Sequence, residues 1–253
     1  MELPAARHLP TWARWLLCGW LGAWVGSVAA ADMDWRPLVA AGELVDVQRV
    51  DPSILVEMRY ATARNGVGRP IYPADLPCLT RPETALRLHL AQVSLRARGY
   101  GLKVWDAYRP PEAQRALWQR WQRRGYVADP NDGRGSLHTW GLAVDVTLVD
   151  SEGQEVSMPS DFDVFTAQAS AIYRGRDALV RTHVRLLFGA MKQAGFVGLS
   201  TEWWHFAARD WQRYKPLPVP GQHAPAATPA ASPSKEAPPE GSSGVRGTRA
   251  RAR

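Results

Sequence analysis

The chain has 253 residues and a formal net charge of +7, which is long enough for one domain with a large core or for two small ones. The charge is unevenly spread: residues 1–31 carry +1 and residues 216–253 carry +3, which leaves +3 for residues 32–215. So small an excess of cations in the central part argues against a nucleic-acid-binding platform.

The first 31 residues are typical of a secretory signal peptide. Arg7 and Arg14 make this segment basic, residues 15–28 form an apolar run, and the alanines at 29–31 offer an A-x-A cleavage site. The run is short for a membrane span of about 20 residues. We therefore expect cleavage rather than an uncleaved anchor, and a periplasmic or secreted protein without a stable membrane span.

Residues 44–58 contain loosely alternating apolar side chains and are predicted to form an entry strand. Residues 60–77 are rich in Gly, Pro and Asn, which predicts an ordered loop. Cys78 is the one cysteine that remains after loss of the signal segment, so no intramolecular disulfide is expected. Its apolar neighbours indicate a buried, inert thiol.

A helix is predicted to begin at a capping box of Thr80 and Glu83 and to end at Gly99. The apolar stripe that should face the core consists of Leu86, Leu90, Val93 and Ala97. A strand is predicted over residues 102–106. One face of this strand is expected to carry Leu102, Val104 and Asp106.

Pro110 and Pro111 predict the start of a second helix that runs to Arg124. After a turn-forming loop at 129–135, a strand is predicted over residues 142–149. One face of this strand bears Leu142, Val144, Val146 and Leu148, and the other bears Ala143, Asp145 and Thr147. Because burying an unpaired carboxylate is costly, we expect Asp145 to point into a cleft.

A third long helix is predicted over residues 177–194, with Gly195 as its stop. Its core face should consist of Val180, Val184, Leu187 and Met191. A last strand carries residues 202–206. Helices and strands alternate too unevenly for a wound parallel sheet. The sequence therefore predicts a single α+β domain over residues 32–215, with helices packed around a small, mainly antiparallel sheet.

The segment over residues 216–253 is rich in Pro, Ala and Ser and ends in an arginine cluster. Such a composition cannot bury enough apolar surface to offset its ordering entropy, so we predict a disordered basic tail. The arginines offer a contact with anionic polymers of the cell envelope, but a solvated chain end is the interpretation we favour.

Two stretches far apart in the chain carry the residue types of a metal site. His138, Asp145 and His205 supply two imidazoles and a carboxylate, which can hold a zinc ion and leave a position open for water. Gly141 allows the sharp bend that would turn His138 towards this point. Glu202 is separated from His205 by two tryptophans, whose apolar wall raises the basicity of a carboxylate. Glu202 is the candidate base for that water.

This site has a geometric requirement and less specific alternatives. Residues three apart in a regular strand face opposite sides, so Glu202 and His205 can share one site only if a bulge or helical turn interrupts the strand. We expect such an irregularity. In the alternatives, Glu202 is an exposed partner of Arg209, Asp145 caps a turn and His138 lies on the surface.

Arg109 leaves a predicted strand just before two prolines, which fix its position. A guanidinium beside a zinc ion stabilises a developing oxyanion through charge-assisted hydrogen bonds. Asp106 is expected either to anchor Arg109 or to orient a ligand imidazole. A purely structural ion pair at a helix start would explain the same two residues equally well.

Several stretches, taken together, resemble the D-alanyl-D-alanine dipeptidases of the VanX type, which are zinc metallopeptidases related to D,D-carboxypeptidases. The stretches are Tyr60-Ala61-Thr62, Trp105-Asp106-Ala107-Tyr108-Arg109-Pro110, Ser136-x-His138-x-x-Gly141-x-Ala143-x-Asp145, Phe162-Asp163 and Glu202-Trp203-Trp204-His205. The resemblance extends from about Val47 to Asp210. It implies an enzyme that hydrolyses the D-Ala-D-Ala dipeptide in the turnover of peptidoglycan-related D-amino acids.

The resemblance also implies roles for individual residues. One zinc ion would be held by His138, Asp145 and His205. Glu202 would act as general base towards the zinc-bound water and then as acid towards the leaving amine, while Arg109 would stabilise the oxyanion. The substrate's free ammonium group would be held by Tyr60, Ser136 and Asp163, which would disfavour blocked or longer peptides.

Two other functions remain open. A D,D-carboxypeptidase would cut longer peptidoglycan stem peptides, and a non-catalytic wall-binding module would retain the fold without activity. The second alternative expects a lost ligand or base, whereas the full set of candidate residues is present. The resistance dipeptidases act in the cytoplasm, whereas the expected signal peptide places the activity of this protein outside it. This location favours the salvage of dipeptides released from peptidoglycan.

Overall fold

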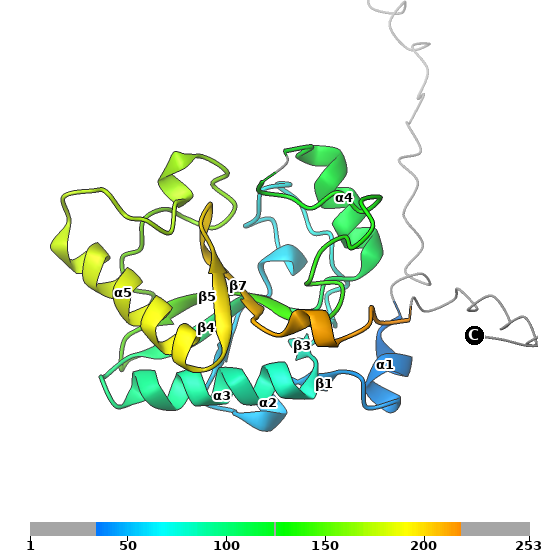
Figure 1. Cartoon of the computed structure of the whole chain (residues 1–253), viewed down its shortest axis with the longest axis horizontal. Helices are drawn as coiled ribbons and strands as arrows, with labels where there is room; N and C mark the ends of the chain where they lie inside the picture. The colour runs from blue at the N-terminus through cyan, green and yellow to red at the C-terminus, as the bar shows by residue number, and fades with distance from the viewer. Residues whose placement is uncertain (1–33, 124, 219–253) are drawn as a thin grey trace, which may run out of the picture. The chain divides into compact units, whose positions relative to one another are not determined.

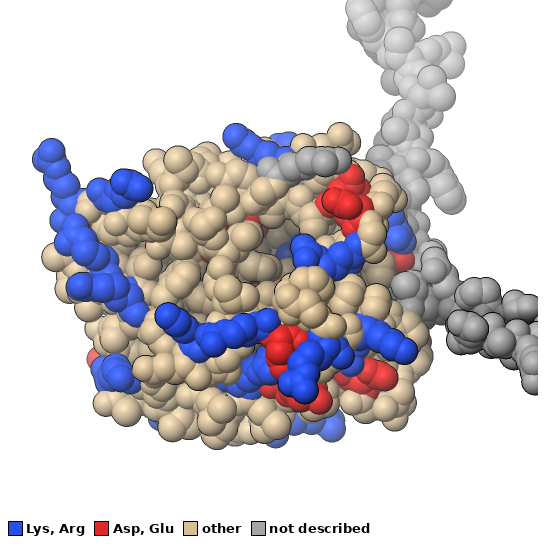
Figure 2. All heavy atoms as spheres, viewed as in Figure 1, with Lys and Arg blue, Asp and Glu red and all other residues tan. Residues whose placement is uncertain are grey.

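The computed structural model describes residues 34–123 and 125–218. The predicted signal peptide and nearly all of the predicted tail lie outside these residues. No helix in the described part of the chain is long and apolar enough to cross a membrane. Figure 2 shows that Lys and Arg predominate among the charged side chains on the face that it presents.

A five-stranded sheet forms the centre of the domain (Figure 1). In spatial order its strands are β2 (Leu55–Val56), β4 (Gly101–Asp106), β5 (Ala143–Val149), β7 (Glu202–Ala208) and β6 (Phe196–Leu199). β2 pairs parallel with β4, and all other neighbours are antiparallel. A separate antiparallel pair joins β1 (Val45–Asp46) to β3 (Leu79–Thr80). The predicted α+β fold with a mainly antiparallel sheet is confirmed.

The helices are α1 (Arg36–Ala40), α2 (Val47–Val50), α3 (Pro82–Arg96), α4 (Pro111–Arg120) and α5 (Ala178–Gln193), with 3-10 turns η3 (Arg59–Ala61), η4 (Ala167–Ala169) and η5 (Trp211–Arg213). α3 packs against α5 and β4, and α5 also contacts β5 and β6. In Figure 1, α3 and α5 lie below and to the left of the sheet, while α4 lies away from them at the upper right.

The predicted entry strand over 44–58 is wrong, because a helical turn divides it into the short strands β1 and β2. The side chain of Asp46 accepts a hydrogen bond from the backbone N–H of Gln48 at 3.0 Å and so caps α2. Such a cap offers the backbone an alternative to a strand ladder. Alternating valines did not outweigh this local signal.

The predicted core face of α3 is also wrong. Leu86, Leu90 and Val93 are 56%, 58% and 53% exposed. The buried face consists instead of Thr84, Ala85, Leu88, Ala91, Gln92 and Leu95. Gln92 can be buried because it donates to the Ser53 carbonyl at 2.9 Å and accepts from the Leu102 N–H at 2.7 Å. Thr80 belongs to β3, and the structure shows no capping box at this helix.

The other two long helices follow the sequence more closely. α5 begins after Asp177, whose carboxylate caps the helix, and its predicted core residues are all buried. α4 begins at Pro111 as predicted but ends at Arg120. There Trp121 leaves the helical conformation, and its Nε1 donates to the Gly66 carbonyl at 2.6 Å. β6 was not predicted; it is the edge strand beside β7.

A bulge in β4 changes which residues share a face. Val104 pairs with Val146, but a register shift after Val104 brings Asp106 opposite Asp145. Asp106 therefore leaves the face of Leu102 and Val104, contrary to the prediction for this strand. Bulges commonly turn a side chain in this way. The result is that two carboxylates meet on the face of the sheet that bears the candidate site.

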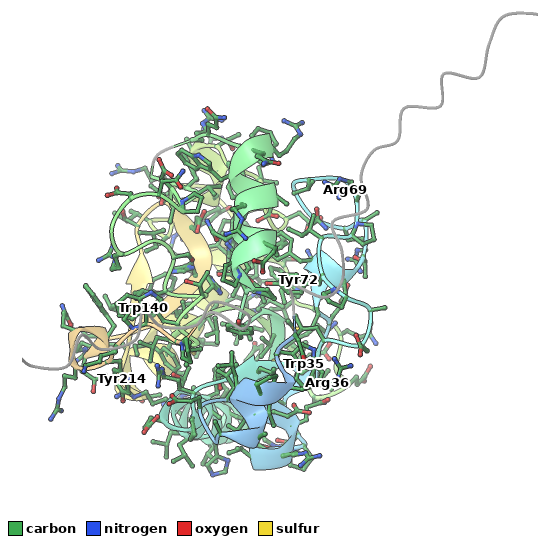
Figure 3. The ribbon with its side chains drawn as sticks, turned by 90° about the vertical axis from the view of Figure 1, so that its right-hand side faces the viewer. Trp35, Arg36, Arg69, Tyr72, Trp140 and Tyr214 are labelled. Atoms are coloured by element: carbon green, nitrogen blue, oxygen red, sulfur yellow. The ribbon has the colours of Figure 1, made fainter. Side chains whose placement is uncertain are left out.

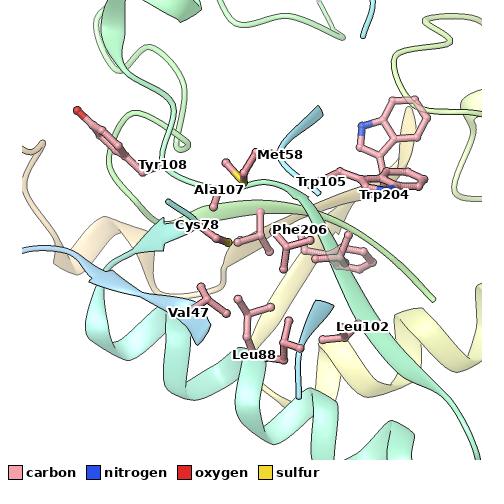
Figure 4. Close-up of a cluster of buried hydrophobic side chains, with 14 of the residues drawn as sticks. Val47, Met58, Cys78, Leu88, Leu102, Trp105, Ala107, Tyr108, Trp204 and Phe206 are labelled. Atoms are coloured by element: carbon pink, nitrogen blue, oxygen red, sulfur yellow. The ribbon is translucent and has the colours of Figure 1, made fainter. Parts of the chain in front are cut away.

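Part of the core lies between the sheet and the helices α3 and α5 (Figure 4). Val47, Leu88, Leu102 and Phe206 are fully buried there. Cys78 is buried with them, as predicted, and burial raises the pKa of its thiol well above the usual value. A thiol in this state is a poor nucleophile.

Candidate metal centre and substrate cavity

His138 is positioned by a tight turn just before β5. Gly141 closes the turn with φ of 68° and donates its N–H to the His138 carbonyl at 3.0 Å. A Cβ at this position would lie 2.8 Å from Leu44 Cδ2, so the site requires glycine. A contact of 2.9 Å between His138 Nδ1 and the Ala107 carbonyl oxygen orients the imidazole ring.

The other two candidate ligands face each other across adjacent strands. Asp145 on β5 is the register partner of His205 on β7. His205 Nδ1 lies 3.0 Å from Asp145 Oδ1 and 3.1 Å from His138 Nε2, and His138 Nε2 lies 3.4 Å from Asp145 Oδ1. Ligand atoms bound about 2.0–2.1 Å from a tetrahedral zinc lie about 3.3 Å apart. The three atoms thus have the spacing of a metal-binding set.

The protonation of these groups fits a cation as well. The Ala107 carbonyl accepts the Nδ1 proton of His138, which leaves Nε2 of a neutral ring with a lone pair towards the cluster. Burial lowers the pKa of His205. Burial would raise the pKa of Asp145, but the adjacent His138 and His205 hold it below the usual range. Neutral imidazoles and an ionised carboxylate are the forms that bind metals.

β7 is irregular between Glu202 and His205, as the sequence required. Opposite it, Gly198 pairs with Phe206 and the very next residue, Leu199, pairs with Glu202. Residues 203–205 are therefore accommodated without partners on β6, and Glu202 and His205 both line the same cavity. The prediction of a bulge or turn at this place is confirmed.

Glu202 is 5% exposed. Burial, together with the negative charges of Asp145 and Asp163, raises the pKa of its carboxyl well above the usual value. The alternative of an exposed partner of Arg209 is excluded, since Arg209 donates instead to the Lys192 carbonyl. Trp204 lines the cavity beside Glu202, whereas Trp203 packs against Trp105 at a centroid distance of 5.5 Å. One of the two tryptophans, not both, thus forms the expected apolar wall.

Arg109 is buried and rigidly held. Its Nε and Nη2 donate to Asp106 Oδ2 at 3.1 and 2.7 Å, and its Nη1 donates to Gln114 Oε1 at 2.7 Å. Nη2 also lies 3.7 Å from Asp145 Oδ2. Asp106 Oδ2 is 3.3 Å from His138 Nδ1, so this carboxylate contacts both the guanidinium and a candidate ligand. Asp106 is therefore in contact both with Arg109, which it was expected to anchor, and with His138, which it was expected to orient.

Tyr60 and Asp163 meet on another wall of the cavity. The Tyr60 hydroxyl donates to Asp163 Oδ1 at 3.1 Å, and the Gly66 N–H donates to Oδ2 at 2.8 Å. Burial raises the pKa of Asp163 to about 7. Ser136 lines the same cavity, but its Oγ accepts from the His138 N–H at 3.3 Å. The structure brings Tyr60 and Asp163 into contact and leaves Ser136 beside the histidine.

All eight candidate site residues line one cavity of about 360 Å³. This volume is near the lower end of the range of about 300–1,000 Å³ for small-molecule sites. The sequence did not indicate Gly66, Gln114 or Arg134. For Gly66 the only signal in the sequence was its place in the predicted glycine-rich loop. The structure gives the reason for this glycine, because a Cβ at residue 66 would lie 3.0 Å from Asp163 Cβ. The other two had no signal in the sequence.

The chain was compared with known proteins. The family model described as D-ala-D-ala dipeptidase matches residues 40–224. The D-alanyl-D-alanine dipeptidase of Escherichia coli (strain K12) is 35% identical over 164 residues, which are 65% of this chain and 83% of that protein. The relative of the same name in Enterococcus faecalis is 29% identical, covering 61% of this chain and 85% of its own length. The relative of the same name in Streptomyces coelicolor is 29% identical, covering 67% of this chain and 93% of its own length.

Among solved structures, a mutant of the vancomycin resistance D,D-pentapeptidase VanY in complex with Zn(II) is 18% identical, covers 53% of this chain and 75% of its own, and has a TM-score of 0.35. A likeness of this size supports no statement about the present site. The family model, by contrast, spans the sheet, the metal-binding set and the cavity. The chain therefore belongs to the D-Ala-D-Ala dipeptidase family of metallopeptidases.

Proposed function

We propose that this protein hydrolyses the free dipeptide D-Ala-D-Ala, with one zinc ion held by His138, Asp145 and His205. The observation that carries the proposal is the convergence of three donor atoms within 3.4 Å in a cavity that also holds a buried carboxylate and a buried guanidinium. A bound zinc supplies a Lewis acid, which polarises a peptide carbonyl and lowers the pKa of a coordinated water. The protein's other groups perform the remaining steps.

Glu202 is the general base and then the general acid. Its raised pKa makes the carboxylate a better proton acceptor than an exposed glutamate. It takes a proton from the attacking water and delivers it to the nitrogen of the leaving D-alanine, whose bond to the carbonyl carbon breaks. Trp204 beside it keeps bulk water away from this transfer.

Arg109 stabilises the oxyanion. A guanidinium has five N–H donors, and the bonds to Asp106 and Gln114 occupy three of them. The remaining donors are available to a substrate oxygen in the cavity. Because the group is already fixed, little reorganisation is needed when charge develops.

Tyr60, Ser136 and Asp163 bind the free ammonium group of the substrate. Asp163 gains most from this pairing. Burial raises the pKa of its carboxyl, and the ammonium group compensates the negative charge of the ionised form. An acylated amino group provides no such charge and leaves the carboxylate unpaired. This difference selects dipeptides over longer stem peptides.

The purified, zinc-loaded protein can be tested with D-Ala-D-Ala and with N-acetyl-D-Ala-D-Ala by measuring the release of free D-alanine. We expect cleavage of the free dipeptide and at most slow cleavage of the acetylated one. Cleavage of the acetylated peptide alone would replace the proposal with a D,D-carboxypeptidase. A protein that binds zinc and cleaves neither would instead be a wall-binding module.

We further propose that the protein acts outside the cytoplasm, in the salvage of D,D-dipeptides released from peptidoglycan. The support is the basic, apolar and small-residue pattern of residues 1–31. Fractionation of cells that express the full chain should yield a shortened protein in the periplasm or medium. Recovery of the uncleaved chain from the cytoplasm would contradict this location.

A further inference from the structure

The cavity contains a second guanidinium that the mechanism does not use. This group belongs to Arg134. The other charged groups that line the cavity are the guanidinium of Arg109 and the carboxylates of Asp145, Asp163 and Glu202. A free dipeptide has one ammonium and one carboxylate group. The proposed function assigns the ammonium to Asp163 and leaves the substrate's carboxylate without a partner.

Arg109 is poorly suited to that carboxylate. Its guanidinium is committed to Asp106 and Gln114, and it lies 3.7 Å from Asp145. Arg134 has a different environment. Within the described part of the chain, the structure pairs Arg109 with carboxylates but shows none in salt-bridge contact with Arg134. Arg134 is also exposed at the cavity, where a ligand can reach it.

The side chain of Arg134 is nonetheless well supported. Its guanidinium carbon lies 4.6 Å from the centroid of the Trp211 ring. The backbone carbonyl of Arg134 accepts a hydrogen bond from Trp140 Nε1 at 3.1 Å, and Trp140 packs edge-on against Trp211. Stacking on an aromatic face restricts a guanidinium and leaves its N–H edges free for bidentate binding of a carboxylate.

The two opposite charges at the cavity lie beside different apolar clusters. Trp140 and Trp211 are part of a small apolar cluster that also includes Leu142, Ala208 and Tyr214. Trp140 and Tyr214 are seen near each other at one side of the molecule in Figure 3. Asp163 instead contacts Tyr60, which belongs to the main core. The cavity thus offers a dipeptide a negative group for its ammonium end and a positive group for its carboxylate end.

We infer that Arg134 binds the free carboxylate of the substrate, so that both charged ends of a D,D-dipeptide are recognised. This inference rests on the proposed function and deepens it. It makes Arg134 a specificity residue, and it predicts that a blocked carboxyl end is disfavoured as well as a blocked amino end.

The test compares D-Ala-D-Ala with its C-terminal carboxamide, which has the same scissile bond and no negative charge. The parent should have a kcat/KM for the free acid roughly 10-fold or more above that for the amide. Arg134→Gln should raise KM for the free acid by a similar factor, change kcat little and leave the amide unaffected. Arg134→Lys, which keeps the charge without the fork geometry, should lie between them.

Arg185→Gln is the matched control, because Arg185 is an exposed arginine on α5 outside the cavity lining and its loss changes the net charge equally. It should retain the parent's preference for the free acid. If Arg134→Gln keeps the parent's preference, or raises KM equally for both substrates, the inference is wrong while the proposed function stands. A parent protein that fails to cleave D-Ala-D-Ala overturns the proposed function itself.

Discussion

Asp163 combines a left-handed backbone with a buried carboxylate, and both properties are unusual. Its φ is 58°, a region in which Asp and Asn are tolerated better than most residues. Tyr60 and the Gly66 N–H satisfy its two oxygens, yet burial still raises its pKa to about 7. A residue that costs stability when ionised is expected where a cationic ligand will compensate it.

Asp163→Asn should reveal this cost in the metal-free, substrate-free protein. Asparagine tolerates the same backbone, and its Oδ1 can accept from the Gly66 N–H while its Nδ2 donates to the Tyr60 hydroxyl, which can also act as an acceptor. The folded pKa of about 7 exceeds the unfolded value of about 3.9, so the folded state binds the proton more tightly. The parent therefore loses stability as pH rises from about 4 to 7, and the asparagine variant does not share this loss.

Urea unfolding of both proteins at pH 5 and pH 8 measures the effect. The free energy of unfolding of Asp163→Asn minus that of the parent should be larger at pH 8. An equal difference at both pH values would show that Asp163 ionises normally. The same variant should bind D-Ala-D-Ala more weakly, because the ammonium loses its charged partner.

At the scale of elements, three departures from regular structure build the site. The bulge in β4 brings Asp106 to Asp145, the irregularity in β7 brings Glu202 and His205 to one cavity, and the turn at Gly141 positions His138. A period-two pattern predicts strands but cannot show where an extra residue enters one. Of the three, the sequence indicated the β7 irregularity and the turn, because the site required them.

Gly141→Ala should destabilise the protein and weaken zinc binding. An alanine at φ of 68° costs about 1–2 kcal/mol, and overlap with Leu44 adds about 1–3 kcal/mol. Gly42→Ala is the control, since Gly42 has φ of 74° and a Cβ at that position would have no heavy atom within 4 Å. It should show the backbone cost alone and unchanged zinc affinity. Equal effects of the two substitutions on unfolding and on zinc titration would contradict the account of this turn.

Helix α3 shows why some faces cannot be deduced from the sequence. Its buried side includes Thr84 and Gln92, which pattern analysis treats as polar, whereas α5 buries a plain apolar stripe capped by Asp177. Gln92 is satisfied by residues distant in the sequence, Ser53 and Leu102. Long-range hydrogen bonds of this kind leave no local signal.

Two substitutions in α3 test which face is buried. Leu88→Ala should lower the free energy of unfolding by about 2–5 kcal/mol, because Leu88 is fully buried. Leu90→Ala, on the side that is 58% exposed, should change it by about 0.5 kcal/mol or less. Chemical denaturation of both variants provides the measurement. Similar losses would restore the apolar stripe as the core face.

For the molecule as a whole, the order of the strands places residues distant in the sequence at one site. β5 and β7 are neighbours although β6 and α5 separate them in the chain, so Asp145 and His205 meet directly. The motif residues of the site were predictable from their combination. The supporting groups Gly66, Gln114 and Arg134 were not, since their roles depend on contacts made only in the folded chain.

Removal of the metal should destabilise the whole domain. A ligand that binds only the folded state contributes RT ln(1 + [L]/Kd), or about 4 kcal/mol at a concentration 1,000 times Kd. A chelator should therefore lower the Tm of the parent, and added zinc should restore it. His205→Ala should have the lower Tm from the start and should respond to neither reagent, which calorimetry can show. A parent Tm that is indifferent to chelation would argue against a metal linking β5 and β7.

The most direct test of the central claim measures D-Ala-D-Ala hydrolysis and zinc content together in Glu202→Gln. This substitution preserves the size of the side chain and removes its ability to accept a proton. We predict one zinc per chain, as in the parent, and a kcat lower by about 10²–10⁴-fold. Near-parental activity of the zinc-loaded variant would contradict the assignment of Glu202, and with it the mechanism proposed for this site.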